Sequence, residues 1–142
     1  RGGTMAITVG INHVATLTTD MDLTVSFYEK AFDATVTFEM AKTADHPWMK
    51  IVEIGDGASL NVFEVAPEEI VGDRMRQGGR GAIDHFAFAV DSRATLEAVR
   101  SRLVDAGALE VGEIQTLGNE LSLFFRDPDG MDLEVCCPAN SQ

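Results

Sequence analysis

Ile83-Asp84-His85-Phe86-Ala87-Phe88-Ala89-Val90 is a short apolar run with a single histidine set into it. A stretch of the same kind, Ile11-Asn12-His13-Val14-Ala15-Thr16-Leu17, stands near the start of the chain. Runs of this length and composition predict strands. Each is followed by a predicted helix and later by a strand that carries one glutamate, Glu64 in the first half and Glu134 in the second. The chain therefore predicts two copies of one structural unit.

The alternation of apolar residues and the positions of turn residues predict the same order of elements in both halves. We expect the first half to form strands over residues 7–17, 34–41, 48–54 and 58–65, with a helix over 21–32 after the first strand. We expect the second half to form strands over 83–90, 109–116, 120–126 and 131–137, with a helix capped by Asp91 or Ser92 that runs to about Ala106. The predicted fold class is α+β, with two tandem βαβββ modules.

A chain of 142 residues with 45% hydrophobic content is long enough to bury one core, so we expect a single domain. Within it, module 1 spans residues 7–65 and module 2 spans residues 83–137. Residues 66–82 form the expected linker, because they combine Pro67 and a mixed charged run with Gly78, Gly79 and Gly81.

The histidine and the glutamate recur at matching distances. His13 and His85 are 72 positions apart (85 − 13), and Glu64 and Glu134 are 70 apart (134 − 64). Each module is therefore expected to carry a histidine on its first strand and a glutamate on its last. If the two modules are related by a pseudo-twofold axis, equivalent positions approach each other.

Strand alternation predicts where two of these side chains point. His13 is in phase with apolar neighbours, so we expect it to point inward. Glu64 shares a face with Leu60 and Val62. Because a buried carboxylate without a partner is costly, Glu64 needs one, and a metal ion or another cation would serve.

The formal net charge is −12 and the isoelectric point is about 4.4. Such a surface repels phosphate backbones and anionic lipid, so neither nucleic acid nor a membrane is an expected partner. The acidic surface would favour a cationic ligand, although an ordinary solvated acidic surface explains the net charge equally.

The only cysteines, Cys136 and Cys137, are neighbours and offer no disulfide framework, so we expect a reduced, cytoplasmic protein.

Two imidazoles and two carboxylates make a mixed nitrogen and oxygen ligand set that suits a borderline divalent ion such as Ni, Zn, Co, Mn or Fe(II). Four ligands leave positions open for water or a small-molecule substrate, as in catalytic sites. The alternative for each residue is a satisfied polar group in a strand. The third histidine, His46, is either an acid or base of the site or a surface residue.

Four motifs resemble the vicinal oxygen chelate superfamily, which includes glyoxalase I, bleomycin resistance proteins and extradiol dioxygenases. They are Ile11-Asn12-His13-Val14, Ser26-Phe27-Tyr28, Ile83-Asp84-His85-Phe86 and the stretch Phe125-Arg126-Asp127-Pro128-Asp129-Gly130-Met131-Asp132-Leu133-Glu134. The resemblance implies paired βαββ-type modules that form an open, cup-shaped mixed sheet with helices outside and a metal ion inside. It also implies a homodimer whose ligands come from one chain or both.

The family's ligand positions map onto His13, Glu64, His85 and Glu134, a set that is similar to glyoxalase I. The resemblance implies a glyoxalase-like lyase or isomerase that chelates neighbouring oxygens of a small carbonyl compound. A carbon-bound proton would move through an enediolate, with Glu64 or Glu134 as the base and Glu134 preferred.

Two other functions remain open. A binding protein of the bleomycin-resistance type would sequester a cationic or aromatic ligand, and a small extradiol-type dioxygenase would use iron held by His13, His85 and Glu134. Glutathione-using members of the family carry an arginine and an asparagine where this chain has Leu17 and Glu68. Another thiol or an unrelated carbonyl compound is therefore the expected substrate.

Overall fold

The computed structural model describes residues 6–70 and 83–141. The elements in chain order are β1 (His13–Thr18), α1 (Met21–Phe32), β2 (Thr35–Met40), β3 (Met49–Gly55), β4 (Ala58–Glu64), the 3₁₀ turn η1 (Pro67–Glu69), β5 (Phe86–Ala89), α2 (Arg93–Ala106), β6 (Gln115–Leu117), β7 (Glu120–Arg126) and β8 (Asp132–Pro138). Most of the predicted linker lies outside the described residues.

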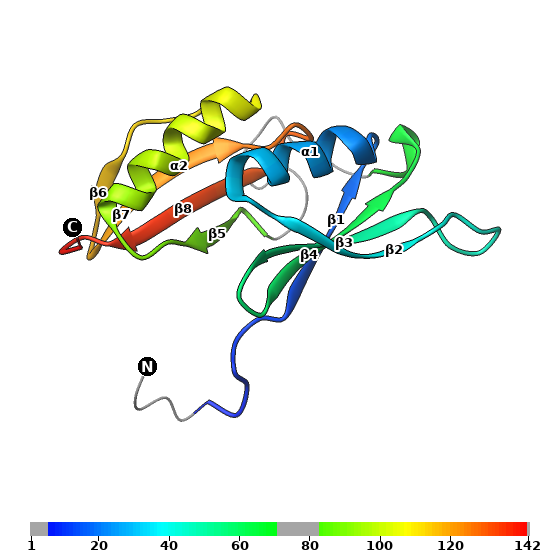
Figure 1. The fold of residues 1–142 in the computed structure, drawn as a ribbon, viewed down its shortest axis with the longest axis horizontal. Coiled ribbons are helices and arrows are strands. Elements are labelled where there is room, and N and C mark those ends of the chain that lie inside the picture. The colour runs from blue at the N-terminus through cyan, green and yellow to red at the C-terminus, as the bar shows by residue number, and fades with distance from the viewer. Residues whose placement is uncertain (1–5, 71–82, 142) are drawn as a thin grey trace.

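Each module forms its own four-stranded mixed sheet, in the order β1-β4-β3-β2 and β5-β8-β7-β6. In both sheets the first strand of the module runs parallel to the last, and the remaining pairs are antiparallel. The predicted α+β fold of two βαβββ modules is confirmed, and the sheets stay open and distinct (Figure 1).

The second strand of module 2 is shorter than predicted. Residues 109–116 were expected to be extended, but β6 covers only Gln115–Leu117, and Leu109 makes a single bridge to Arg126. Glu110 adopts a left-handed backbone with φ 50°, which interrupts an extended strand. The ladder therefore resumes only at β6.

Local side chains set the helix ends. Asp20 caps α1 by accepting a hydrogen bond from the Leu23 N–H at 3.1 Å, and Ser92 caps α2 by accepting one from Thr95. Gly107, with φ 87°, ends α2 as predicted, because glycine takes the left-handed conformation without a steric penalty. Within the described part of the chain, neither helix is long and apolar enough to cross a membrane.

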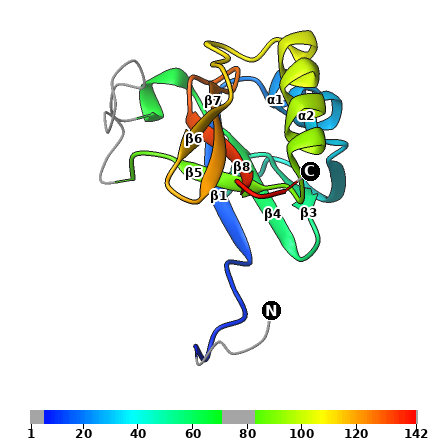
Figure 2. The same cartoon turned by 90° about the vertical axis from the view of Figure 1, so that its left-hand side faces the viewer.

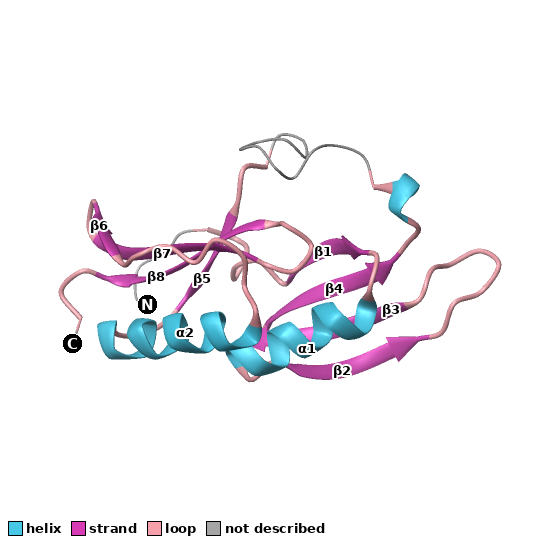
Figure 3. Cartoon of the chain, turned by 90° about the horizontal axis from the view of Figure 1, so that it is seen from above, coloured by secondary structure: helices cyan, strands magenta, loops and turns pink. Residues whose placement is uncertain are grey.

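Strand alternation divides each sheet into a helix face and an open face. Leu60 and Val62 in β4, and Leu133 and Val135 in β8, are at most 1% exposed and point toward the helices. Figures 1 and 2 show α1 and α2 on the same side of the molecule, and Figure 3 shows them nearly end to end along it. Among the described residues, no helix covers the opposite face of either sheet.

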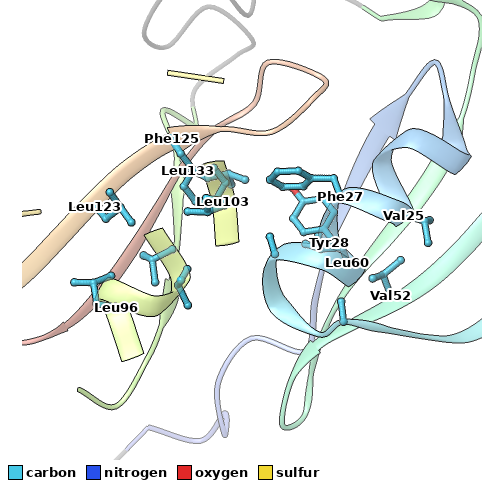
Figure 4. Packing of buried hydrophobic residues seen from close by; sticks show 14 of the residues in the cluster. Val25, Phe27, Tyr28, Val52, Leu60, Leu96, Leu103, Leu123, Phe125 and Leu133 are labelled. Atoms are coloured by element: carbon cyan, nitrogen blue, oxygen red, sulfur yellow. The ribbon is translucent and has the colours of Figure 1, made fainter. Parts of the chain in front are cut away.

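An aromatic cluster and a polar turn join the two modules. Phe27 of α1 packs on Phe125 of β7 with ring centroids 6.3 Å apart, and Phe32 lies 5.1 Å from Phe88 of β5 (Figure 4 shows Phe27 facing Phe125). Both helices also meet through an ion pair, in which Arg102 of α2 holds Asp33 just after α1. The core is therefore continuous across the modules.

The turn between β7 and β8 reaches from module 2 into module 1. The Tyr28 hydroxyl of α1 donates to Asp127 Oδ2 at 2.7 Å. The hydroxyls of Thr18 and Thr24 donate to the Asp129 carboxylate at 2.9 and 2.6 Å. Asp127 is 4% exposed, and its burial raises the pKa of its carboxyl to about 6, although the Tyr28 and Met131 hydrogen bonds act in the opposite direction.

This raised pKa predicts a specific pH dependence of stability. Because the folded pKa of Asp127 lies above its ordinary value of 3.8, its favourable contribution is complete below pH 3.8 and is lost as pH rises through about 6. Between pH 7 and pH 4.5 the parent should gain about 2 kcal/mol in free energy of unfolding relative to Asp127→Asn, measured by urea denaturation. Asp105→Asn, on the exposed face of α2, is the control and should track the parent. Parallel curves for the parent and Asp127→Asn would contradict the prediction.

Candidate functional site

A histidine and a glutamate meet on the open face of module 2. His85 Nε2 lies 3.1 Å from Glu134 Oε1, and the Ser122 hydroxyl donates to Glu134 Oε2 at 2.7 Å. His85 stands just before β5, and Glu134 lies in β8, the strand parallel to it. The Glu134 side chain is 12% exposed and the His85 side chain 33%, so the pair is partly shielded but accessible.

The two predicted histidines are oriented in the same way. His85 Nδ1 lies 2.6 Å from Asp84 Oδ2, and His13 Nδ1 lies 2.8 Å from Asn12 Oδ1. Each ring thereby directs Nδ1–H to an oxygen of the preceding residue and keeps Nε2 for another partner, as metal-binding histidines commonly do. The hydrogen bond to Asp84, and then the contact with Glu134, raise the pKa of His85.

The strand register shows which residue of module 1 corresponds to Glu134. Phe86 pairs with Leu133, so Glu134 lies two positions beyond the level of His85 along β8. His13 pairs with Ser59, so the residue two positions beyond its level along β4 is Asn61. Asn61 therefore takes the place in module 1 that Glu134 takes in module 2.

Glu64 lies elsewhere. It pairs with Thr18 at the far end of β1, on the helix face with Leu60 and Val62, as the alternation predicted. Its Oε2 accepts the backbone N–H of Met21 at 2.9 Å, so the partner that a half-buried carboxylate requires is the first turn of α1. The structure thus separates Glu64 from His13 by both distance along the strand and face of the sheet.

His13 itself lies on the open face and is exposed, so the expectation that it points inward is wrong. His46 lies with Glu64 and Trp48 around a cleft of about 570 Å³ at the other end of module 1. The His46 ring contacts Phe63, and its Nδ1 lies 2.6 Å from the Pro47 carbonyl oxygen.

The open face of module 1 holds an oxygen without a partner. Asn61 Oδ1 is the only buried side-chain oxygen or nitrogen in residues 6–70 and 83–141 that lacks a hydrogen bond. Its neighbours across the strands are Ala15 and Ile51, whose side chains offer no donor. An unpartnered buried amide oxygen costs about 1–3 kcal/mol, so this position favours a cation or a ligand that donates a hydrogen bond.

One chain does not bring all of these groups together. Across the described parts, the only set of three ligand atoms within 4.8 Å of one another belongs to Glu120, Glu134 and Cys136, and His13 is not in it. Burial, together with the nearby Glu120 carboxylate, raises the pKa of the Cys136 thiol to about 12, so this free thiol is protonated at neutral pH. His85 and Glu134 supply two convergent donors. A hollow of about 340 Å³ lies beside His85 and is bordered by Phe124 and Arg126 among others.

Sequence reasoning passed over Asn12, Asp84 and Asn61, although signals for them exist. A polar residue precedes the histidine in both opening motifs. His13 to Asn61 spans 48 positions (61 − 13), which is closer to the 49 between His85 and Glu134 (134 − 85) than the 51 to Glu64 (64 − 13). Glu64 also lies on the same face of its strand as apolar residues, whereas Glu134 lies on the face opposite to Leu133 and Val135.

The chemistry of these donors fits a divalent metal ion. An imidazole nitrogen, which binds a metal ion once it has lost its proton, and a carboxylate oxygen already converge at 3.1 Å, and His13 is oriented in the same manner as His85. Nitrogen and oxygen donors of this kind suit borderline first-row ions. The residues that would hold the ion are thus His13, His85 and Glu134.

Comparison with known proteins gives a consistent result. The profile of the Glyoxalase/Bleomycin resistance protein/Dioxygenase superfamily matches residues 10–135. A metallothiol transferase FosB from Shouchella clausii is 33% identical over 130 residues, which cover 89% of this chain and 78% of that protein.

Solved structures share the fold. A glyoxylase/bleomycin resistance protein/dioxygenase domain from Frankia sp. EAN1pec superposes with a TM-score of 0.75 at 23% identity, covering 95% of this chain and 96% of that one. The fosfomycin resistance protein FosX from Listeria monocytogenes superposes with a TM-score of 0.69 at 17% identity, covering 94% and 97%. The chain therefore belongs to the glyoxalase/bleomycin resistance protein/dioxygenase superfamily.

Proposed function

We propose that this protein is a metal-dependent transferase that joins a thiol to a small electrophile carrying neighbouring oxygens. His13, His85 and Glu134 would hold the divalent ion. The observation that carries the proposal is the convergence of His85 Nε2 and Glu134 Oε1 at 3.1 Å, with His13 oriented by Asn12 as His85 is by Asp84. Mn, Fe(II), Co, Ni and Zn all suit this donor set.

Thiol transfer fits a site with one carboxylate. When bound, the ion would act as a Lewis acid that draws electron density from a substrate oxygen. Glu134 is held by Ser122 and faces His85, so its role is to bind the ion and fix its position. In the proposed reaction the thiol sulfur forms a bond to carbon, the carbon–oxygen bond breaks, and the released oxygen takes the thiol proton. The 33% identical relative named a metallothiol transferase supports this reaction class.

A glyoxalase-like lyase or isomerase is the second candidate. It would need a base beside the ion, and Glu134 would be the candidate, because Glu64 lies on the other face of its sheet and accepts a backbone N–H of α1. His13, His85 and Glu134 would equally serve an iron-dependent dioxygenase, and the acidic chain would suit a protein that sequesters a cationic drug.

We also propose that two copies of the chain share the site. The open face that carries His13 and the open face that carries His85 and Glu134 belong to different sheets, and their ligand atoms do not form one group within the described chain. A homodimer that pairs module 1 of one copy with module 2 of the other would bring them together.

The two free cysteines favour a reducing, cytoplasmic setting for the protein.

Metal content tests the ligand set. Purified without an affinity-metal step, the parent should carry about one divalent ion per chain by mass spectrometry, because three donors are oriented to bind it. His85→Ala should lower metal affinity at least about 100-fold, whereas His46→Ala should change it less than about twofold. Equal effects of the two substitutions would show that the wrong histidines were chosen.

Mixing subunits tests the shared site. His13→Ala and His85→Ala homodimers should each fail to bind metal. A heterodimer of the two should bind one ion, because the unmodified module 1 of one copy meets the unmodified module 2 of the other. The measurement is metal content of the heterodimer isolated with two different tags. A heterodimer without metal would place the whole site within one chain.

Product analysis tests the reaction. The metal-loaded protein would be given a panel of thiols with fosfomycin as an oxygen-rich epoxide, and separately with methylglyoxal. Mass spectrometry should find a thiol adduct of the epoxide, lost at least about 100-fold in Glu134→Gln. Glu64→Gln should keep activity within about threefold, because its amide oxygen can still accept the Met21 N–H. Formation of a lactoylthiol from methylglyoxal would instead favour the lyase. Uptake of oxygen when a catechol is added would favour the dioxygenase.

A further inference from the structure

We infer that Asn61 is the module 1 counterpart of Glu134 and that its carboxamide oxygen is a fourth protein contact of the metal ion. This inference rests on the proposed function, because it requires a metal site. Asn61 would take the fourth ligand position, which the sequence pattern had assigned to Glu64. This ligand would be a neutral amide instead of a carboxylate.

The first support is geometric. Each module places a histidine at the start of its first strand or just before it and, two positions beyond its level on the neighbouring parallel strand, a polar side chain on the same open face. In module 2 that offset brings Glu134 Oε1 to 3.1 Å from His85 Nε2. The same offset in module 1 places Asn61 beside His13. Since parallel strands keep this spacing, Asn61 is within reach of a group bound by His13.

The second support is the state of the amide itself. Asn61 Oδ1 is buried and accepts no hydrogen bond in the described chain, while Ala15 and Ile51 flank it across the strands. Buried amide oxygens are nearly always paired, so an exception points to a partner that arrives from outside the chain. A divalent cation satisfies such an oxygen, because carbonyl oxygens bind Mn and similar ions.

A neutral group at this position changes the character of the site. With Glu134 as the one carboxylate, a bound divalent ion keeps a net positive charge, whereas two carboxylates would neutralise it. A less neutralised ion is the stronger Lewis acid, and the weaker amide contact can yield to a substrate oxygen. Asn61 would thereby set both how tightly the ion is held and how strongly it polarises the substrate.

Metal titration tests this role directly. Asn61→Ala should weaken affinity for Mn(II) or Co(II) by about 10–100-fold and change the visible absorption spectrum of the Co(II) form, because a ligand is lost. Asn61→Asp, which keeps the shape and adds a negative charge, should bind the ion more tightly than the parent. Asn119→Asp adds the same charge at an exposed turn between β6 and β7 and should leave affinity and spectrum unchanged.

Thermal unfolding without metal provides a second readout. Because Asn61 Oδ1 lacks a partner in the metal-free chain, Asn61→Ala should leave the metal-free midpoint unchanged or higher, while removing most of the stabilisation that metal gives the parent. If Asn61→Ala fails to fold, Asn61→Asp decides. Metal affinity within about twofold of the parent, together with an unchanged Co(II) absorption spectrum, in the folded variants would overturn the inference.

The same titration separates this inference from the proposed function. If the parent binds no metal and His85→Ala behaves identically, the metal site itself is wrong. If the parent binds metal, His85→Ala loses it, and the Asn61 variants keep the parent's affinity, only the role of Asn61 is wrong.

Discussion

The alternation of side chains along a strand is the constraint on which the rest of this structure depends. Each sheet commits one face to a helix, and the residues in phase with that face, such as Leu60 and Leu133, are fully buried. Polar residues out of phase are left on the open face. A shift of one residue in either parallel pair would exchange the two sets. Whether a carboxylate on the last strand of a module accepts a helix N–H or meets a histidine on the open face is therefore decided by the parity of its position.

The two modules use the same framework for different chemistry. In module 1 the glutamate at the end of β4 is in phase with the core and accepts a backbone N–H of α1. In module 2 the glutamate of β8 is out of phase and meets a histidine. A duplicated βαβββ unit thus carries one glutamate that stabilises a helix and one that faces a histidine on the open side of its sheet. Matching residue types in two repeats do not by themselves show matching roles.

The junction between the modules determines how the two open faces are presented. Tyr28, Thr18 and Thr24 of module 1 bind the Asp127 and Asp129 carboxylates in the turn of module 2. Aromatic rings from both modules also pack against one another. The turn motif that most strongly indicated the superfamily is therefore also one of the contacts that hold the halves together. The helices share one side, so that in the described chain no helix covers the faces with His13 and His85.

The amino-acid sequence by itself determined the duplication, the helix ends and the superfamily. Those features follow from local periodicity, from the helix-ending residue Gly107 and from motifs contiguous in the chain. It also identified His85 and Glu134 as candidates that the structure brings together. Only the tertiary structure decided that Asn61 rather than Glu64 corresponds to Glu134, and that His13 lies on an open face. The physical reason is that the register between parallel strands separated by some forty residues is set by packing across the sheet, and no local pattern encodes it.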